Sequence, residues 1–339
     1  MLDLRPLRNL GSDRLYALPL LVLYLTDGCN SRCLSCAIWH APRRNMPLAL
    51  ALRLAEEAAA LGLRHVLLSG GEAMQHPHWA EIAQAFRKRG VHVGLLTNGL
   101  LLKKQAEQVI AHVDQLTLSL DAATPELYAH IRGVDALPHI LEGMARIAPH
   151  VPIITRTTVQ RANFRQLSAI VGLAKAYGAR KVSFLAVDTV NGEAFGARAA
   201  ETFQELALTA DDLPIFAEVL DALEREHAAD FASGLIAESP AKLRTLYAFF
   251  ASAHGLARFP APRCNAPQLS VVVETDGRLR PCYFLPSGGS VAEQPLAQAL
   301  NSSTLRALRR AVRHGERAEC GRCVCPLYRG ARALLRAAL

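Results

Sequence analysis

The first half of the chain alternates short runs of β-branched and large apolar residues with amphipathic stretches, and this alternation is the strongest constraint on its fold. Six runs have the character of strands: Leu20–Thr26, Arg64–Ser69, Val91–Thr97, Val113–Leu120, Val151–Gln160 and Lys181–Val187. The stretches between them carry helix-boundary residues, with Pro47 at a start and Gly62 and Gly178 at ends. The sequence therefore predicts six consecutive βα units.

Repeated βα units predict a parallel sheet with helices outside it. Six units fit an open, partial (β/α)6 TIM barrel, so the predicted fold class is α/β. In such barrels the loops after the carboxyl ends of the strands carry the chemistry. Motifs that directly follow a strand are therefore the candidates for a functional site.

Two further sections follow the predicted barrel. From Asp188 to about Ala261 the chain is rich in Ala, Leu and acidic residues without strand patterns, which predicts a helical connector. From Pro262 on, two apolar runs flank Asp276-Gly277, a hairpin signal. The expected boundaries of the barrel, the connector and a small C-terminal domain are 15–190, 191–261 and 262–339.

The basic balance of the chain does not by itself indicate a nucleic-acid partner. The net charge is +8, but Arg and Lys are spread along the sequence. The densest group has helical spacing and predicts a solvated helix face rather than a binding patch. Its members are Arg306, Arg309, Arg310, Arg313 and Arg317. We expect no nucleic-acid partner.

The longest apolar run, Leu15–Leu25, is interrupted by Pro19 and is too short to span a bilayer. Arginines precede it, so a signal peptide ending at Cys29 is an alternative, but Thr26-Asp27-Gly28 is a poor cleavage context. The run is better interpreted as a strand of a cytoplasmic protein without a membrane partner.

Three cysteines directly follow the first predicted strand. Cys29, Cys33 and Cys36 have the spacing C-x3-C-x2-C. Three thiolates on one loop can hold three irons of a four-iron cluster and leave the fourth without a protein ligand, open to a substrate or cofactor. The alternative is a zinc knot or a fully ligated cluster, which needs a fourth ligand such as His40.

The other five cysteines lie near the C-terminus: Cys264, Cys282, Cys320, Cys323 and Cys325. Four residues separate Gly277 from Cys282, and the last three cysteines form C-x2-C-x-C. A hairpin with a cysteine at each side, closed by a later C-x2-C, suits a second tetrahedral site. On spacing alone, an iron–sulfur cluster and a zinc ribbon are equally good interpretations.

The cysteine motif after the first strand of a βα repeat resembles the signature of the radical S-adenosylmethionine (SAM) superfamily. By this resemblance, SAM binds the open iron and is cleaved reductively to methionine and a 5′-deoxyadenosyl radical. That radical then abstracts hydrogen from a substrate C–H bond. The resemblance is strong over residues 20–187 and moderate over 262–326.

Other residues match the superfamily's SAM contacts, and the resemblance implies their roles. Ser69-Gly70-Gly71-Glu72 resembles its Gly-Gly-Glu motif, with Glu72 accepting from the ammonium of SAM, although Ala73 replaces the usual proline. Thr97-Asn98-Gly99 ends the third strand, as in related enzymes. The remaining candidates are Ser119 and Arg132, for the ribose and carboxylate of SAM, with Asp121 as support. For Asp121, capping of a helix N-terminus or stabilisation of the helix dipole is an equal alternative.

The C-terminal cysteines resemble the SPASM/twitch extension of radical SAM enzymes. Five cysteines are fewer than the full SPASM set, so the resemblance favours the twitch form with one auxiliary 4Fe-4S cluster. The expected ligands are Cys264, Cys282, Cys320 and Cys323, and the sequence leaves open whether Cys325 replaces Cys323. Two 4Fe-4S clusters and SAM are thus the expected cofactors.

The resemblance implies a radical SAM enzyme, oxidoreductase-like, that works with a reductant such as flavodoxin or ferredoxin. No residue can be named as the catalytic base. Because 28 residues precede Cys29, too few for a peptide-recognition domain, oxidation or rearrangement of a small metabolite is favoured. The alternatives are a peptide-modifying enzyme, or a non-catalytic iron–sulfur or zinc scaffold.

Overall fold

The computed structural model describes residues 3–189, 191, 194–259 and 262–336. The chain divides into two compact units. The first unit contains Met1–Gly28, Pro42–Leu95 and Pro262–Leu339, and the second contains Cys29–Ala41 and Leu96–Ala261. The predicted domain boundaries follow the sequence instead and stay predictions; Ala261 and residues 337–339 lie outside the described residues.

The strands of the first unit run in the order β3-β2-β1-β7-β8. Their bounds are β1 Leu20–Thr26, β2 His65–Gly70, β3 His92–Thr97, β7 Ser270–Val273 and β8 Leu279–Arg280. β1 pairs in parallel with both β2 and β7, whereas β7 and β8 are antiparallel. Leu21, Val22 and Leu23 of β1 are at most 3% exposed, as expected for a strand covered on both faces.

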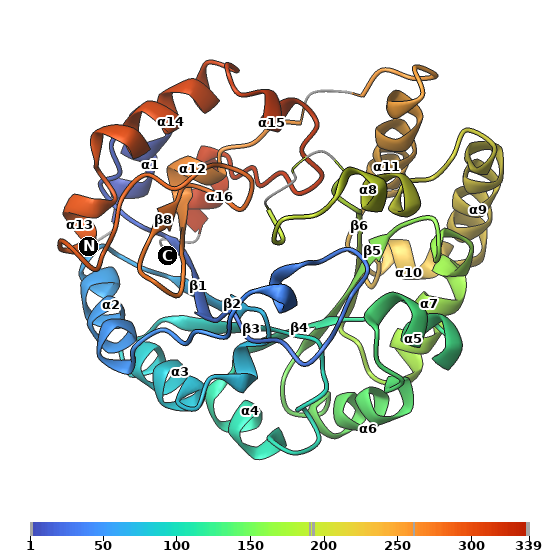
Figure 1. Cartoon of the computed structure of the whole chain (residues 1–339), viewed down its shortest axis with the longest axis horizontal. Helices are drawn as coiled ribbons and strands as arrows, with labels where there is room; N and C mark the ends of the chain where they lie inside the picture. Colours follow the sequence, from blue (N-terminus) through green and yellow to red (C-terminus); the bar gives the residue numbers. More distant parts are fainter. Residues whose placement is uncertain (1–2, 190, 192–193, 260–261, 337–339) are drawn as a thin grey trace. The chain divides into compact units, whose positions relative to one another are not determined.

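Among the helices of the first unit, α2 and α3 lie on the outer side of β1, β2 and β3 (Figure 1). Their bounds are α1 Arg5–Leu10, α2 Leu48–Ala60, η2 Ala73–Gln75, α3 Trp79–Arg87, α12 Ala266–Leu269, α13 Leu296–Ala299, α14 Ser303–Arg313, α15 Ala318–Gly321 and α16 Ala331–Arg336. α2 starts after Pro47, as predicted, and places Leu54, Ala55 and Ala58 in the core.

In the second unit β4, β5 and β6 pair in parallel, and the last two residues of β3 also belong to this unit. The strand bounds are β4 Gln115–Ser119, β5 Ile153–Val159 and β6 Lys181–Ala186. The helices before Asp188 are η1 Ile38–His40, α4 Ala106–His112, α5 Pro125–Arg132, α6 Leu137–Ile147, η3 Phe164–Gln166 and α7 Leu167–Ala176. All six predicted strands are therefore confirmed, with ends shifted by two residues at most.

The predicted connector is helical. It contains α8 Ala200–Leu206, α9 Asp212–Glu226, α10 Ala228–Ala232 and α11 Pro240–Ala253. It also returns to the sheet, because the Val182 amide donates to Leu235 O at 2.7 Å and the Ala237 amide donates to Val182 O at 2.8 Å. Phe216 of α9 packs edge to face on Phe164, so the segment shares the core of the second unit.

The C-terminal section contains the predicted hairpin, as β7 and β8. Its basic helix, α14, is only partly the expected solvated face. Arg306, Arg310 and Arg313 are exposed, but Arg309 is fully buried. Its guanidinium donates to the backbone carbonyls of Pro267, Asp13 and Leu300, so it fastens backbone segments together instead of facing water.

Within the residues that the structure describes, no helix combines the length and apolar character needed to cross a membrane.

Candidate cofactor and cluster sites

The first cysteine motif forms a loop after β1 that is held at its backbone. Cys29, Cys33 and Cys36 are half-buried. The Arg32 amide donates to Arg132 O and the Leu34 amide to Ile131 O, both at 3.0 Å. These carbonyls close α5, and Gly133 follows with φ of 67°. A Cβ at Gly133 would lie 2.5 Å from Arg32 O, so glycine is required for the loop to rest there.

The cysteines of this loop are partly shielded from water and have polar neighbours. Cys29 Sγ accepts from the Ser31 amide at 3.4 Å and from Asn98 Nδ2 at 3.8 Å. Burial, followed by the nearby thiols of Cys33 and Cys29, raises the pKa of Cys36 to about 11. The three thiols thus lie within electrostatic reach of one another, and metal binding must displace their protons.

Asn98, predicted to contact the cofactor, supports the cysteine loop. It is 4% exposed, and its amide donates to Asn30 Oδ1 at 2.8 Å as well as to Cys29 Sγ. Its own Oδ1 accepts from the Leu100 amide at 3.0 Å. Both ends of the side chain therefore have protein partners, and its role in SAM binding stays a prediction.

Asp121 and Arg132 form a buried ion pair of 2.9 Å, with side chains 4% and 11% exposed. Burial would lower the pKa of Arg132, but Cys33, Asp121 and Tyr128 outweigh it and raise the pKa. Helix capping by Asp121 is excluded, because Thr124 is the N-cap of α5 and accepts from the Leu127 amide. Asp121 Oδ1 accepts instead from the Thr158 amide at 2.7 Å.

Ser119 ends β4, as predicted, and pairs in register with Arg156 of β5. Its side chain is half-buried. The strand end thus places Ser119 two residues before Asp121.

In the first unit, Gly70 and Gly71 pack against the backbone that precedes the cysteine loop. A Cβ at either position would lie 2.3 Å from a carbonyl oxygen, of Thr26 and Gly28 respectively. The Glu72 amide donates to Gly28 O at 2.8 Å, and its fully buried carboxylate accepts from the Met74 amide. Glycine is therefore required at positions 70 and 71 by the close approach of this backbone, whether or not a ligand binds there.

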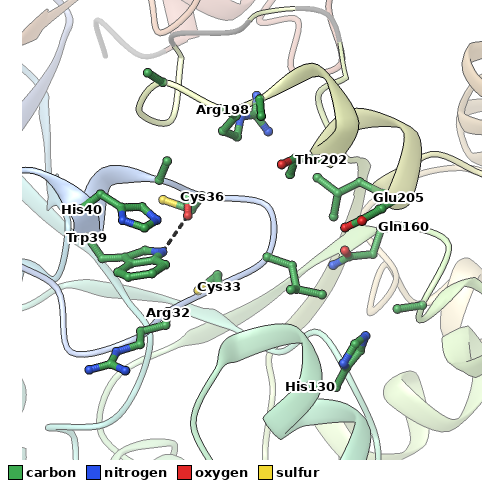
Figure 2. A pocket seen from close by; sticks show the side chains of 16 residues that line it. Arg32, Cys33, Cys36, Trp39, His40, His130, Gln160, Arg198, Thr202 and Glu205 are labelled. Atoms are coloured by element: carbon green, nitrogen blue, oxygen red, sulfur yellow. Dashed lines mark hydrogen bonds between the residues drawn. The ribbon is translucent and has the colours of Figure 1, made fainter.

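A cavity of about 650 Å³ opens beside the cysteine loop in the second unit. Cys33, Cys36 and Trp39 line one side (Figure 2). Trp39 Nε1 donates to Cys36 O at 2.8 Å, and its ring stacks on His40 at 3.6 Å between centroids. His40, the alternative fourth ligand, is exposed and stacked at the cavity wall.

The segment after β6 fastens the cysteine loop from another direction. The Ala37 amide donates to Phe195 O at 2.7 Å, and Arg198 Nη1 donates to Ser35 O at 3.0 Å. Arg198 pairs with Asp188 at 3.1 Å, with side chains only 2% and 1% exposed. Arg198 was not recognised from the sequence, because no local motif marks a contact with a loop so distant along the chain.

The second cysteine group gathers in the first unit. Cys264, Cys282, Cys320 and Cys323 are half-buried, whereas Cys325 is exposed. Burial, with smaller effects of Cys320 and Cys264, raises the pKa of Cys282 to about 12. Burial also raises the pKa of Cys323, with Cys325, Cys264 and Cys282 adding to the effect. All five thiols are thus brought near one another.

The donor atoms of both cysteine groups bear on the kind of metal. Every expected ligand is a cysteine thiol, and thiolates are the ligands of iron–sulfur clusters. The donor chemistry of both groups therefore fits iron–sulfur clusters. Among the described residues, no three His, Cys, Asp or Glu side chains converge on one metal-ion position.

The chain resembles known proteins in both sequence and fold. The chain is 32% identical over 162 residues to the AdoMet-dependent heme synthase of Methanosarcina barkeri, covering 46% of each chain. It is 28% identical over 172 residues to a probable GTP 3′,8-cyclase of Saccharolobus solfataricus, covering 49% of this chain and 56% of that one. The chain thus spans about half the length of the curated relatives it matches.

The fold resembles that of Streptococcus suis SuiB bound to SAM, with a TM-score of 0.66 and 16% identity, over 89% of this chain and 70% of SuiB. This likeness concerns the fold alone, and it confirms the predicted partial barrel with a further C-terminal domain.

Two family models match the sequence and together cover more than half of it. Residues 23–182 match the radical SAM superfamily, and residues 264–324 match the SPASM family, an iron–sulfur cluster-binding domain. The expected cofactors, 4Fe-4S clusters and SAM, are those of these families. The chain thus contains a radical SAM domain over residues 23–182 and a C-terminal SPASM domain over residues 264–324.

Proposed function

We propose that this chain binds a 4Fe-4S cluster on Cys29, Cys33 and Cys36, cleaves SAM reductively and abstracts hydrogen from a substrate C–H bond. One observation carries the proposal: three half-buried cysteines share one loop beside a cavity, and the second unit contains no other cysteine. One iron would therefore lack a cysteine ligand. A non-catalytic scaffold has no need of such an open position.

When bound, the cluster supplies the electron for SAM cleavage. The chain's own residues hold the loop that presents the three thiolates. Asn98 and the Ser31 amide donate to Cys29 Sγ, and the carbonyls of Ile131 and Arg132 fix the loop backbone. The segment 194–199 fastens the loop through Phe195 and Arg198. These contacts hold the three thiolates in position for a cluster.

The SAM contacts are part of the same proposal. Ser119 and Arg132 would hold the ribose and carboxylate, and Asp121 orients Arg132 through their ion pair. Glu72, set by the turn of Gly70 and Gly71, would accept from the ammonium group. Support comes from the strand-end placement of Ser119 and Glu72 and from the burial of the Asp121–Arg132 pair.

We assign the auxiliary 4Fe-4S cluster to Cys264, Cys282, Cys320 and Cys323. The exposure of Cys325 supports Cys323 as the fourth ligand, because a half-buried thiolate is better shielded from water. A fully ligated cluster at this site suits electron transfer from a substrate radical.

The proposed substrate is a small polar metabolite, since the cavity of about 650 Å³ is of the size that holds small ligands. A peptide substrate is the second candidate, because a solved structure of SuiB, a protein of similar fold, holds a precursor peptide. A reductant such as flavodoxin or ferredoxin and a cytoplasmic location complete the proposal. The location is supported by the eight cysteines, which are free thiols rather than disulfides. The reductant is supported by the electron that SAM cleavage requires.

The proposal is tested by iron content and EPR spectroscopy of anaerobically reconstituted protein. Wild type should bind about eight irons, and a triple Cys29, Cys33 and Cys36→Ala variant about four, as two independent clusters require. The EPR signal of the reduced first cluster should change when SAM is added, and this change should be absent from the triple variant. Four irons with one zinc in wild type, or no effect of SAM, would contradict it.

A further inference from the structure

The strand end of β5 presents one buried polar group that the proposed function does not use. Gln160 directly follows β5 and is 1% exposed. It lines the cavity beside the cysteine loop, and neither Nε2 nor Oε1 of its amide has a hydrogen-bond partner. Figure 2 shows Gln160 near Glu205, on the side of the cavity opposite Trp39 and His40.

The backbone amide and carbonyl of Gln160 both form hydrogen bonds, so the unpaired side-chain amide belongs to a well-held segment. Its backbone amide donates to Asn163 Oδ1 at 2.9 Å, and its carbonyl accepts from Asn163 and Phe164, both at 3.0 Å. Asn163 in turn donates to the carbonyls of Asp121 and Thr158. The Arg161 amide donates to Leu206 O at 2.9 Å, which fixes the end of α8 beside it.

A buried amide with both ends unpaired costs free energy, and proteins pair such groups with rare exceptions. The free energy is recovered by a ligand that supplies an acceptor for Nε2 and a donor for Oε1. A site with such a group also rejects analogues that leave it unpaired. The position of Gln160 on the cavity wall thus suits selection among ligands.

We propose that Gln160 is a specificity-determining residue that recognises a flat ligand edge carrying a hydrogen-bond donor and an acceptor side by side. Two sources offer this chemistry: the N6/N7 edge of an adenine, and the primary carboxamide or lactam group of a substrate. The inference rests on the proposed function, because that function brings SAM and a substrate to this cavity.

Binding measurements separate the two sources. SAM and 7-deaza-SAM, which lacks the N7 acceptor, are titrated into the anaerobic holoenzyme by calorimetry. If the edge is that of adenine, wild type binds SAM about tenfold or more tightly than 7-deaza-SAM. Gln160→Met, of similar volume, removes the preference. Gln204→Met, at an exposed glutamine of α8, keeps it.

If the edge belongs to the substrate, Gln160→Met binds SAM as wild type does, and the SAM-bound crystal soaked with acetamide shows the amide paired with Gln160. The same soak of Gln160→Met crystals then shows no acetamide. The inference is overturned if wild type binds SAM and 7-deaza-SAM equally tightly and the soaked wild-type crystal shows no acetamide at Gln160.

Cleavage of SAM by wild type under strong reductant is measured in parallel. Its presence beside failed probes overturns this inference alone, whereas its absence from wild type overturns the proposed function itself.

Discussion

At the residue scale, the ion pair of Asp121 and Arg132 is the feature that most closely joins fold and proposed site. Sequence reasoning selected both residues, but their contact with each other was not predicted. The alternative of helix capping failed because Thr124 has that role. Two buried charges are stable here because each neutralises the other, and Asp121 also accepts from the Thr158 amide.

Removal of one partner of this ion pair should strongly lower the stability of the folded chain. Arg132→Met should lower the free energy of unfolding by about 3 kcal/mol, because Asp121 stays buried without a counter-charge. Asp121→Asn with Arg132→Met removes that charge and should recover much of the loss. The stability of anaerobic protein is followed by circular dichroism in denaturant, with Arg225→Met at an exposed arginine as the control. Equal losses in the single and double variants would contradict the account.

At the scale of elements, the strands were predictable and their long-range partners were not. The runs of β1 to β6 are bounded by turn residues, so local pattern sufficed. β7 was expected in a hairpin of a separate domain, yet it also pairs in parallel with β1. The four residues Ser270–Val273 carry no signal of that partner, because pairing over such a separation depends on the whole sheet.

In the candidate site, too, local motifs were predictable from the sequence and long-range contacts were not. Motif residues such as Cys29 and Glu72 were found from their spacing and strand-end positions. Gln160 and Arg198 were missed, because their importance lies in burial and contacts that no local pattern encodes. Arg198 holds the cysteine loop through its bond to Ser35 O and is itself paired with Asp188.

We expect the first cluster to be lost when the contacts of Arg198 with the cysteine loop are removed. Arg198→Met removes the bond to Ser35 O and the counter-charge of the buried Asp188, so the cysteine loop should lose its fixed shape. Iron retained after desalting should fall from about eight per chain toward about four. Arg198→Lys should retain more, since it restores the charge. If Arg198→Met keeps about eight irons and an unchanged EPR spectrum, the segment does not position the cluster.

At the scale of the whole molecule, the two cysteine groups belong to different compact units. The first loop belongs to the second unit, and the C-terminal group belongs to the first. β1 pairs on one side with β2 of the barrel and on the other with β7 of the C-terminal section. The strand that leads into the first cysteine loop is therefore also the one that fastens the section holding the second group.

The measurement that tests the central claim most directly is the fate of SAM. Anaerobically reconstituted wild type with a strong reductant should convert SAM to 5′-deoxyadenosine and methionine, measured by liquid chromatography and mass spectrometry. The Cys29, Cys33 and Cys36→Ala variant should form neither product, whereas Cys325→Ala, at the exposed cysteine, should form both. Continued cleavage by the triple variant, or none by wild type with both clusters present, would contradict the account.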